Sequence, residues 1–325
     1  MKHITILVPE GASINGVEGP RLGFKEVNNY LQAKGEKPIF KVVFAGLKKS
    51  VRVSGGTYTI ATDVLLNDIK KTDLIIIPAF YGSLREAVEA NKKFIPWIIA
   101  QHKKGAEVAS LCVGAFLLAA TGLLKGKQCS THWRATNDFR KLFPDVNLVV
   151  DRILTDEDGI YSSGGAYSST NLILYLIEKY AGREIAIYCS KLFQLDIDRG
   201  CQSPFIMFNG QKEHDDDSIK IAQEFIENNF QDKITVDRLA EIAALSRRNL
   251  ERRFKKATSN TIVEYIQRVK IEAAKKSLEA SRKSINEVMF DVGYSDTKAF
   301  RTVFKKITGL SPVQYRNKYT NIVTA

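Results

Sequence analysis

The sequence has few cysteines and no long apolar run. Only four cysteines occur in 325 residues, at positions 112, 129, 189 and 201, without CxxC spacing or a nearby pair of histidines. We therefore expect neither a metal site nor a disulfide framework. The longest nearly apolar run, residues 111–124, is too short to span a bilayer. The N-terminus enters a strand-like segment without the hydrophobic region of a signal peptide, so we expect a cytoplasmic protein.

The composition is that of a globular chain with an uneven charge. Hydrophobic residues make up 44% and charged residues 26% of the sequence, and its length allows two or three domains. The formal net charge is +12, and residues 218–325 carry 21 Lys and Arg against 12 Asp and Glu. A basic excess can simply be a solvated surface. Its concentration in the last third favours a nucleic-acid partner.

A short basic pattern occurs twice in that last third. Residues 246–256 read Ser-Arg-Arg-Asn-Leu-Glu-Arg-Arg-Phe-Lys-Lys, and residues 296–306 read Asp-Thr-Lys-Ala-Phe-Arg-Thr-Val-Phe-Lys-Lys. The first begins with a serine that can cap a helix, and each places apolar side chains four positions apart. Residues 236–243 and 285–289 each read as a short helix before the basic one, and residues 262–280 read as a connecting helix. This is the arrangement of two helix-turn-helix units.

The first two thirds alternate between strand-like and helix-like segments. Strands are predicted at 3–8, 39–44, 73–77 and 107–111, with helix-period segments at 19–34, 63–70 and 84–104 and further helices at 166–181 and 183–197. This alternation predicts an α/β fold with a mostly parallel, flavodoxin-like sheet covered by helices on both faces. Residues 1–208 are assigned to this domain, the polar residues 209–217 to a linker, and residues 218–325 to an all-α double helix-turn-helix domain.

Cys112 occupies a strand-turn-helix junction. A strand ends there and a helix of small residues, 113–121, begins at once. The helix N-terminus would lower the pKa of the thiol, and His132 is a candidate base or hydrogen-bond partner. The alternative is a buried structural cysteine beside a capping histidine.

The N-terminal region resembles the DJ-1/PfpI (class I glutamine amidotransferase-like) superfamily, in the branch found in transcription regulators. The residues that carry the resemblance are Cys112 to Lys127, Ser130-Thr-His132-Trp, Asp151-Arg152, the 156–159 hairpin, Ser163 to Asn171 and Arg199 to Phe205. Enzymes of that superfamily place an acid four residues before a proline, but Gly16 stands four residues before Pro20 and the nearest acid is Glu18. The resemblance therefore implies a fold whose Cys112, His132 and Glu18 line a small-molecule pocket, with no catalytic residue assigned.

The C-terminal region resembles the AraC/XylS-type DNA-binding domain. The resemblance is carried by Leu239 to Ala243, Ser246 to Lys256, Tyr265 to Ala274, Ile285 to Tyr294, Phe300 to Lys306 and Thr308 to Arg316. Ser259-Asn260-Thr261 departs from the usual Gly and Pro, so this loop can differ from its counterpart. Helical phase and the resemblance assign base contacts to Arg248, Glu251, Arg252, Lys298, Arg301 and Thr302. Phosphate contacts are assigned to Arg253, Lys255, Lys256, Lys305 and Lys306.

These observations predict a sequence-specific DNA-binding transcription regulator whose N-terminal domain senses a small molecule or dimerises. The expected partners are double-stranded DNA, read in two adjacent major grooves, and a second copy of the chain through the N-terminal domain. A small-molecule effector and RNA polymerase are further candidates, and no cofactor, metal or membrane contact is expected. The alternative is a Cys112-dependent hydrolase or glyoxalase-like enzyme carried on a DNA-binding protein.

Overall fold

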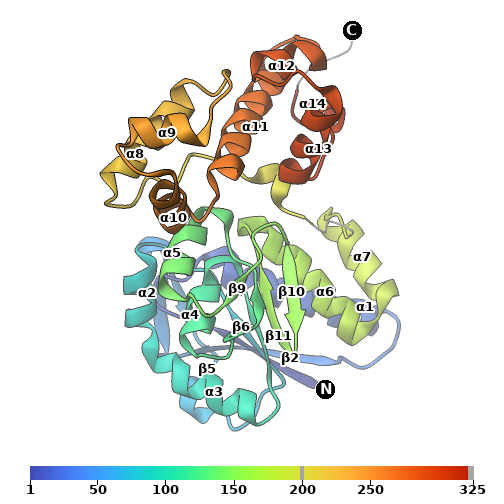
Figure 1. Ribbon diagram of the computed structural model, residues 1–325. Helices are drawn as coiled ribbons and strands as arrows, with labels where there is room; N and C mark the ends of the chain where they lie inside the picture. The colour runs from blue at the N-terminus through green and yellow to red at the C-terminus, as the bar shows by residue number, and fades with distance from the viewer. Residues whose placement is uncertain (198–200, 321–325) are drawn as a thin grey trace. The chain divides into compact units, whose positions relative to one another are not determined.

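The chain forms two compact units, Met1–Gln202 and Ser203–Ala325. The computed structural model in Figure 1 describes residues 1–197 and 201–320. Arg199 and Gly200, which belong to one of the motifs of the N-terminal resemblance, lie outside these described residues. Among the described residues, no helix combines the length and the apolar character that crossing a bilayer requires.

A seven-stranded sheet forms the centre of the first unit. Its strand order is β10-β11-β7-β6-β1-β2-β5, and every neighbouring pair is parallel except β10 with β11. Between the edge strands β10 and β5, the order by chain position is 2-1-3-4-5, which is the flavodoxin-like order. The predicted mostly parallel sheet is thus confirmed. The strands are β1 (Lys2–Leu7), β2 (Phe40–Gly46), β5 (Val64–Leu65), β6 (Leu74–Ile77), β7 (Glu107–Ser110), β10 (Leu154–Glu157) and β11 (Ile160–Ser163).

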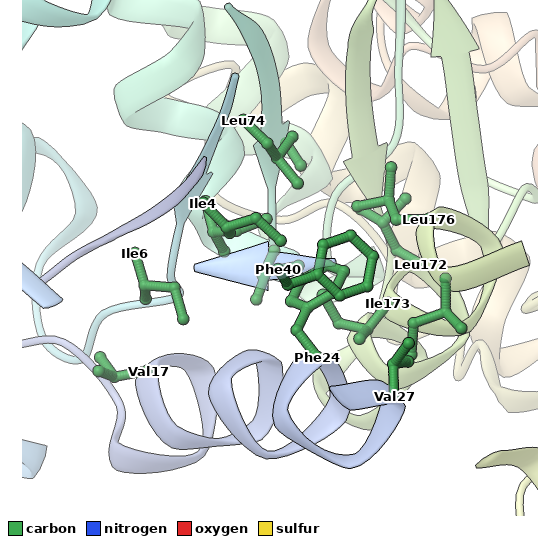
Figure 2. Packing of buried hydrophobic residues seen from close by; sticks show 14 of the residues in the cluster. Ile4, Ile6, Val17, Phe24, Val27, Phe40, Leu74, Leu172, Ile173 and Leu176 are labelled. Atoms are coloured by element: carbon green, nitrogen blue, oxygen red, sulfur yellow. The ribbon is translucent and has the colours of Figure 1, made fainter. Parts of the chain in front are cut away.

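Helices cover both faces of this sheet because its central strands are apolar on both sides. Leu74 and Ile76 of β6 belong to one buried cluster, whereas Ile75 and Ile77 belong to the other. The first cluster includes side chains of α1 (Ile14–Ala33), α6 (Ser169–Ala181) and α7 (Arg183–Phe193), and Figure 2 shows Phe24 of α1 beside Phe40 of β2. The second lies under α2 (Leu84–Ala90), α3 (Ile95–Lys103), α4 (Ala115–Ala120) and α5 (Thr136–Leu142).

Two of the predicted helical segments differ in the structure. Residues 63–70 form the edge strand β5 and a short 3-10 turn, because Val64 and Leu65 pair with Ala45 and Gly46 of β2. Residues 84–104 form two helices, since the buried Asn91 side chain bonds to both backbone groups of Glu10 and ends α2. A hairpin of β3 (Ser50–Val53) and β4 (Tyr58–Ala61) and a parallel pair of β8 (Gln128–Cys129) and β9 (Asn147–Leu148) were not predicted.

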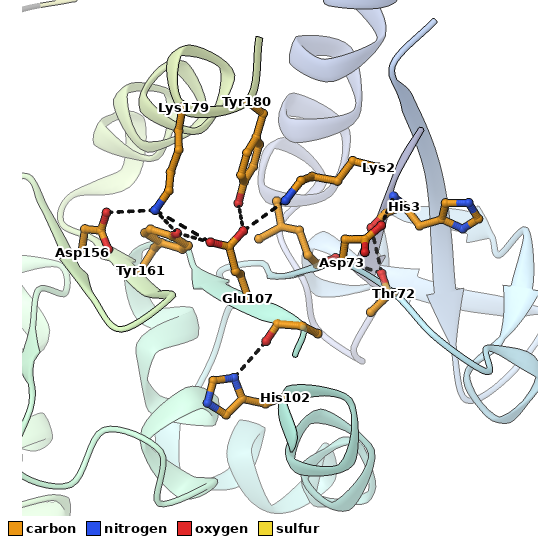
Figure 3. Close-up of polar contacts among 12 residues, drawn as sticks. Lys2, His3, Thr72, Asp73, His102, Glu107, Asp156, Tyr161, Lys179 and Tyr180 are labelled. Atoms are coloured by element: carbon orange, nitrogen blue, oxygen red, sulfur yellow. Dashed lines mark hydrogen bonds and ion pairs between the residues drawn. The ribbon is translucent and has the colours of Figure 1, made fainter. Parts of the chain in front are cut away.

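A polar network joins the amino ends of the strands on the α6 side (Figure 3). The carboxylate of Glu107, at the start of β7, accepts hydrogen bonds from Tyr161, Tyr180 and Lys2. Burial acts to raise the pKa of Glu107, but the tyrosine hydroxyls and the Lys2 charge together hold it below its ordinary value. Lys179 adds a bond of 2.5 Å to the Tyr161 hydroxyl. The network therefore ties β1, β7, β11 and α6 together at the sheet end opposite Cys112.

The second unit is helical and has two cores joined by one helix. Its first core contains Leu250, Phe254 and Tyr265, and its second contains Ile271, Phe300 and Phe304. Helix α11 contributes to both cores and runs from Ile262 to Ala280, as predicted. The helices are α8 (Asp217–Asn228), α9 (Val236–Ile242), α10 (Arg247–Thr258), α11 (Ile262–Ala280), α12 (Ile285–Asp291), α13 (Thr297–Thr308) and α14 (Pro312–Tyr319).

Candidate functional site

Helix α10 is an amphipathic helix with a basic outer face. Leu250, Phe254 and Thr258 are buried against the first core, at positions four residues apart. The predicted base-contacting residues Arg248, Glu251 and Arg252 are exposed on the other side. Because residues 248, 251 and 252 share one helical face, the helix can present all three to a groove at once.

Helix α13 repeats this construction fifty residues later. The carboxylate of Asp296 caps it by accepting the backbone N–H of Ala299 at 2.5 Å. Phe300 and Phe304 are fully buried. The five candidate contact residues of this helix are all exposed: Lys298, Arg301, Thr302, Lys305 and Lys306.

The turn after each basic helix has the same conformation despite the difference in sequence. Ser259 takes a φ of 59°, in the left-handed region that Gly309 takes with 74° in the second half. Thr261 and Ser311 then cap α11 and α14, each with a capping box. The departure at residues 259–261 therefore leaves the loop equivalent, and the expectation that it can differ is wrong.

The two halves differ in how their basic side chains are paired. In α10, the guanidinium of Arg247 contacts Asp237 and Glu251 at 3.3 and 3.4 Å, and Lys255 lies 3.9 Å from Glu264. Among the described residues, no ion pair engages the four basic side chains of α13. Internal carboxylates therefore neutralise part of the first basic helix and leave the second free.

Arg253 has a partner that the sequence did not reveal. Its Nε and Nη2 donate to the two carboxylate oxygens of Asp216 at 2.9 and 2.6 Å. The bidentate bond to Arg253 is the main reason that the pKa of Asp216 lies below its ordinary value. Asp216 also caps α8 by accepting from the N–H of Ile219. Arg253 is thus held by the residue that caps α8, which is 37 positions earlier in the chain.

The residues before Asp216 are packed on the helical unit. The compact units divide after Gln202, and the ring of Phe208 lies 5.1 Å from that of Tyr265, nearly perpendicular to it. The side chain of Gln223 donates to the carbonyl of Gln211 and bonds to His214 at 2.9 Å. Residues 209–217, expected to be a linker, therefore carry bonds that hold them to α8.

In the first unit, the turn at Cys112 has the strained geometry of a nucleophile elbow. Cys112 has a φ of 55°, and its N–H donates to the hydroxyl of Ser163 at 3.3 Å. The thiol is almost completely buried. Burial raises its pKa to about 11, and the backbone N–H of Val113 offsets only part of this effect. The expected lowering of the Cys112 pKa by the helix N-terminus is therefore wrong.

His132 acts as a helix cap. Its Nδ1 accepts the N–H of Arg134 at 3.1 Å at the start of a short 3-10 helix. Burial lowers the pKa of His132, and the positive charge of Arg134 lowers it further. The neighbouring Thr131 donates its hydroxyl to the carbonyl of Cys112 at 3.0 Å. These contacts correspond to the structural alternative, a buried cysteine next to a capping histidine.

The position at which the related enzymes carry an acid is Gly16 in this chain, and the nearest acid, Glu18, is engaged elsewhere. Glu18 forms a two-bond ion pair with Arg21 at 2.8 and 2.9 Å, and both side chains are partly exposed. Gly16 is buried, and a Cβ there would lie 2.7 Å from the hydroxyl of Ser13 and 3.1 Å from the backbone N of Ala79. The described residues contain no group of three or more His, Cys, Asp or Glu that could hold a metal ion.

Comparison with known families assigns both units. The DJ-1/PfpI family matches residues 23–179, and the helix-turn-helix domain family matches residues 239–318. The chain joins a DJ-1/PfpI domain to an AraC-type helix-turn-helix domain. Its relatives include the HTH-type transcriptional regulator GbdR of Pseudomonas aeruginosa, 26% identical over 257 residues that cover 78% of this chain and 68% of GbdR.

Two further comparisons cover the domains separately. The AraC-type domain is similar to the bifunctional transcriptional activator and DNA repair enzyme AdaA of Bacillus subtilis, 39% identical over 106 residues, or 33% of this chain and 50% of AdaA. The DJ-1/PfpI domain has the fold of a crystallised protein from Vibrio parahaemolyticus, with a TM-score of 0.53, 19% identity and coverage of 59% and 98% of the two chains. With this domain pair, the protein is a DNA-binding regulator of transcription.

Proposed function

We propose that the AraC-type domain reads specific double-stranded DNA by placing α10 and α13 in two successive major grooves. The observation that carries this proposal is that α11 belongs to both cores and so holds the two basic helices at a fixed separation. With 19 residues, α11 is roughly 29 Å long. Successive major-groove faces lie about 34 Å apart on B-DNA, and bending of the DNA can make up the difference.

Base recognition is assigned to the exposed outer faces of the two helices. Arginine can bond bidentately to guanine, and a glutamate can accept from the amino group of cytosine. The proposed base contacts are Arg248, Glu251 and Arg252 of α10 and Lys298, Arg301 and Thr302 of α13. Glu251 first has to leave its ion pair with Arg247.

Phosphate contacts are assigned to the flanking basic side chains, which position the domain without reading sequence. Lys255, Lys256, Lys305 and Lys306 are exposed at the C-terminal ends of the two helices. Arg253 is the exception, since it can reach a phosphate only by giving up its ion pair with the carboxylate of Asp216.

For the DJ-1/PfpI domain we propose control of the DNA-binding unit, through effector sensing or dimerisation, without catalysis. A thiol with a raised pKa contains little of the thiolate that nucleophilic chemistry requires. Glu18, the nearest acid to the position where the related enzymes carry theirs, pairs with Arg21. The proposal implies a cytoplasmic protein, because a DNA-bound regulator acts where the chromosome is, and RNA polymerase is then a natural partner.

Selection of bound fragments from genomic DNA by the full chain tests the proposal. We expect an enriched site with two elements whose centres are about 10–10.5 base pairs apart. Arg301→Ala should relax the sequence of one element and leave the other unchanged. Fragments with no shared sequence, or a single element that Arg301→Ala does not affect, would contradict two-groove reading.

A further inference from the structure

A cavity of about 180 Å³ that is partly open to solvent lies in the DJ-1/PfpI domain, and the cysteine turn does not account for it. It opens between α1 and the first half of α6, and Figure 2 shows Ile173 of α6 on the side that faces α1. Its apolar wall includes Leu22, Ile173, Ile177 and Phe193. Leu111, the residue before Cys112, also lines it, but neither Cys112 nor His132 does.

Gly19 of α1 is one of the residues that line the hollow, and it contributes no side chain to it. A Cβ at Gly23 would lie 2.8 Å from a methyl group of Ile173, so the packing of α1 on α6 requires that glycine. A Cβ at Gly19 would meet no atom within 4 Å. Gly19 suits the residue before Pro20, where a larger residue crowds the proline ring. The same glycine leaves an open space that nothing in the domain fills.

The lining defines the chemistry that the cavity can accept. None of its thirteen lining residues carries a charge, and its polar groups are the amide of Asn15 and the hydroxyls of Ser169 and Thr170. A charged ligand would lose its hydration there without gaining an ion pair, which is costly. An uncharged molecule with an apolar body and one hydrogen-bonding end would bury the body against the wall and direct its polar end to Asn15.

We propose that this cavity is the effector site, and that it takes a small uncharged amphipathic molecule of one ring or a short branched chain. An apolar cavity of about 150 Å³ in another protein holds benzene, so a volume of this size suits roughly six to eight non-hydrogen atoms. The assignment rests on the proposed sensing function. It separates the ligand site from Cys112, which then has only a structural role in the turn after β7.

Benzyl alcohol is a suitable probe, with benzoate and benzylammonium as charged counterparts of similar size. The full-length protein is titrated with each compound while the isoleucine methyl resonances are followed by NMR. We expect benzyl alcohol to shift the methyl signals of Ile173 and Ile177, which line the cavity, and to leave Ile98 on the other face of the sheet unchanged. The charged compounds should produce no saturable shift at either position.

A pair of substitutions at Gly19 provides the matched control. Gly19→Leu places a side chain in the hollow, whereas Gly19→Ala introduces the same contact with Pro20 and leaves most of the space free. We expect Gly19→Leu to weaken benzyl alcohol binding by about tenfold or more relative to Gly19→Ala, because the ligand gains its affinity from the buried apolar wall. Thermal unfolding of both variants checks that each is folded.

Three results would overturn the assignment. The first is that the Ile173 and Ile177 signals do not respond to benzyl alcohol, and the second is that the two Gly19 variants bind it equally well. The third is that Gly19→Leu abolishes a dimer that Gly19→Ala keeps, which would show that a second copy of the chain covers this face. DNA binding by the unmodified protein is measured in parallel. If the unmodified protein does not bind DNA, the proposed function is refuted. If it binds DNA but does not respond to benzyl alcohol, only the assignment of the cavity as the effector site is refuted.

Discussion

Replacing Asp216 with Asn should make DNA binding more dependent on salt. Asn caps a helix as well as Asp does, so the bond to Ile219 and the start of α8 are retained. The substitution removes the charge that holds Arg253 through two bonds of 2.9 and 2.6 Å. Arg253 is then free to contact a phosphate.

The magnitude follows from counterion release. Each additional phosphate contact steepens the plot of log K against log salt by about 0.9, which is roughly threefold to fourfold in affinity across a fourfold change in salt. We expect that increment for Asp216→Asn, almost no change for Arg253→Gln alone, and a return to the original slope for the double variant. Asp217→Asn is the matched control, because Asp217 lies one position further along α8 and pairs with Lys220 instead.

Fluorescence anisotropy with a labelled duplex over a salt series measures these slopes. The reasoning is refuted if Arg253→Gln flattens the slope by about 0.9 while Asp216 is intact, because Arg253 would then already contact a phosphate. It is also refuted if Asp217→Asn has the same effect as Asp216→Asn, which would indicate a general charge effect. Only the predicted slopes of all four variants, each compared with the unmodified protein, support an exchange of partners by Arg253.

Five further outcomes are expected. Arg252→Ala should cost about 1–3 kcal/mol of specific affinity and relax the preference at one base, whereas equal weakening on all sequences would indicate a phosphate contact. Alkylation of Cys112, with Cys112→Ser as the control, should keep rising with pH beyond pH 9, because its pKa is about 11 and only the thiolate reacts; a plateau below that pH would contradict the burial argument. Ala244→Gly should stabilise the second unit by roughly 0.5–1 kcal/mol in urea unfolding, since Ala244 has a φ of 52°, which glycine adopts more easily. Gly293→Ala should destabilise the same unit by about 1–3 kcal/mol, because a Cβ there would lie 2.0 Å from a backbone oxygen. Gly16→Glu should lower the melting temperature without increasing thiol reactivity, and a gain in reactivity would mean that the site can be restored.

Local signals were sufficient to predict the helical unit. The bounds of α11 agree with the sequence because Thr261 and Glu264 form a capping box three residues apart, which the chain specifies by itself. The exposed and buried faces of α10 and α13 follow from helical phase in the same way. Residues 63–70 have apolar residues at helical spacing, but their pairing with β2 is a long-range contact that periodicity does not contain.

Among the site residues too, the features set by local sequence were predicted, and those set by long-range contacts were not. The strained turn at Cys112 follows from its strand-turn-helix sequence, but its pKa depends on burial by distant parts of the fold, which reverses the predicted direction. The partner of Arg253 could not be predicted, because Asp216 is 37 residues away and lies in a polar segment that reads as a linker. The i to i+4 spacing of Arg247 and Glu251 was a visible signal for the ion pair that now engages a proposed base contact.

Helix α11 sets an angular relation between α10 and α13 as well as a distance. Inserting one residue in its middle would rotate everything beyond it by about 100° and advance it by 1.5 Å, whereas inserting four would rotate it by only about 40°. The first change would turn one basic face away from the DNA, and the second would keep both faces on the same side of the duplex at a longer spacing. If α10 and α13 occupy two successive major grooves as proposed, the 19 residues of α11 set both the spacing and the relative rotation of the two DNA elements.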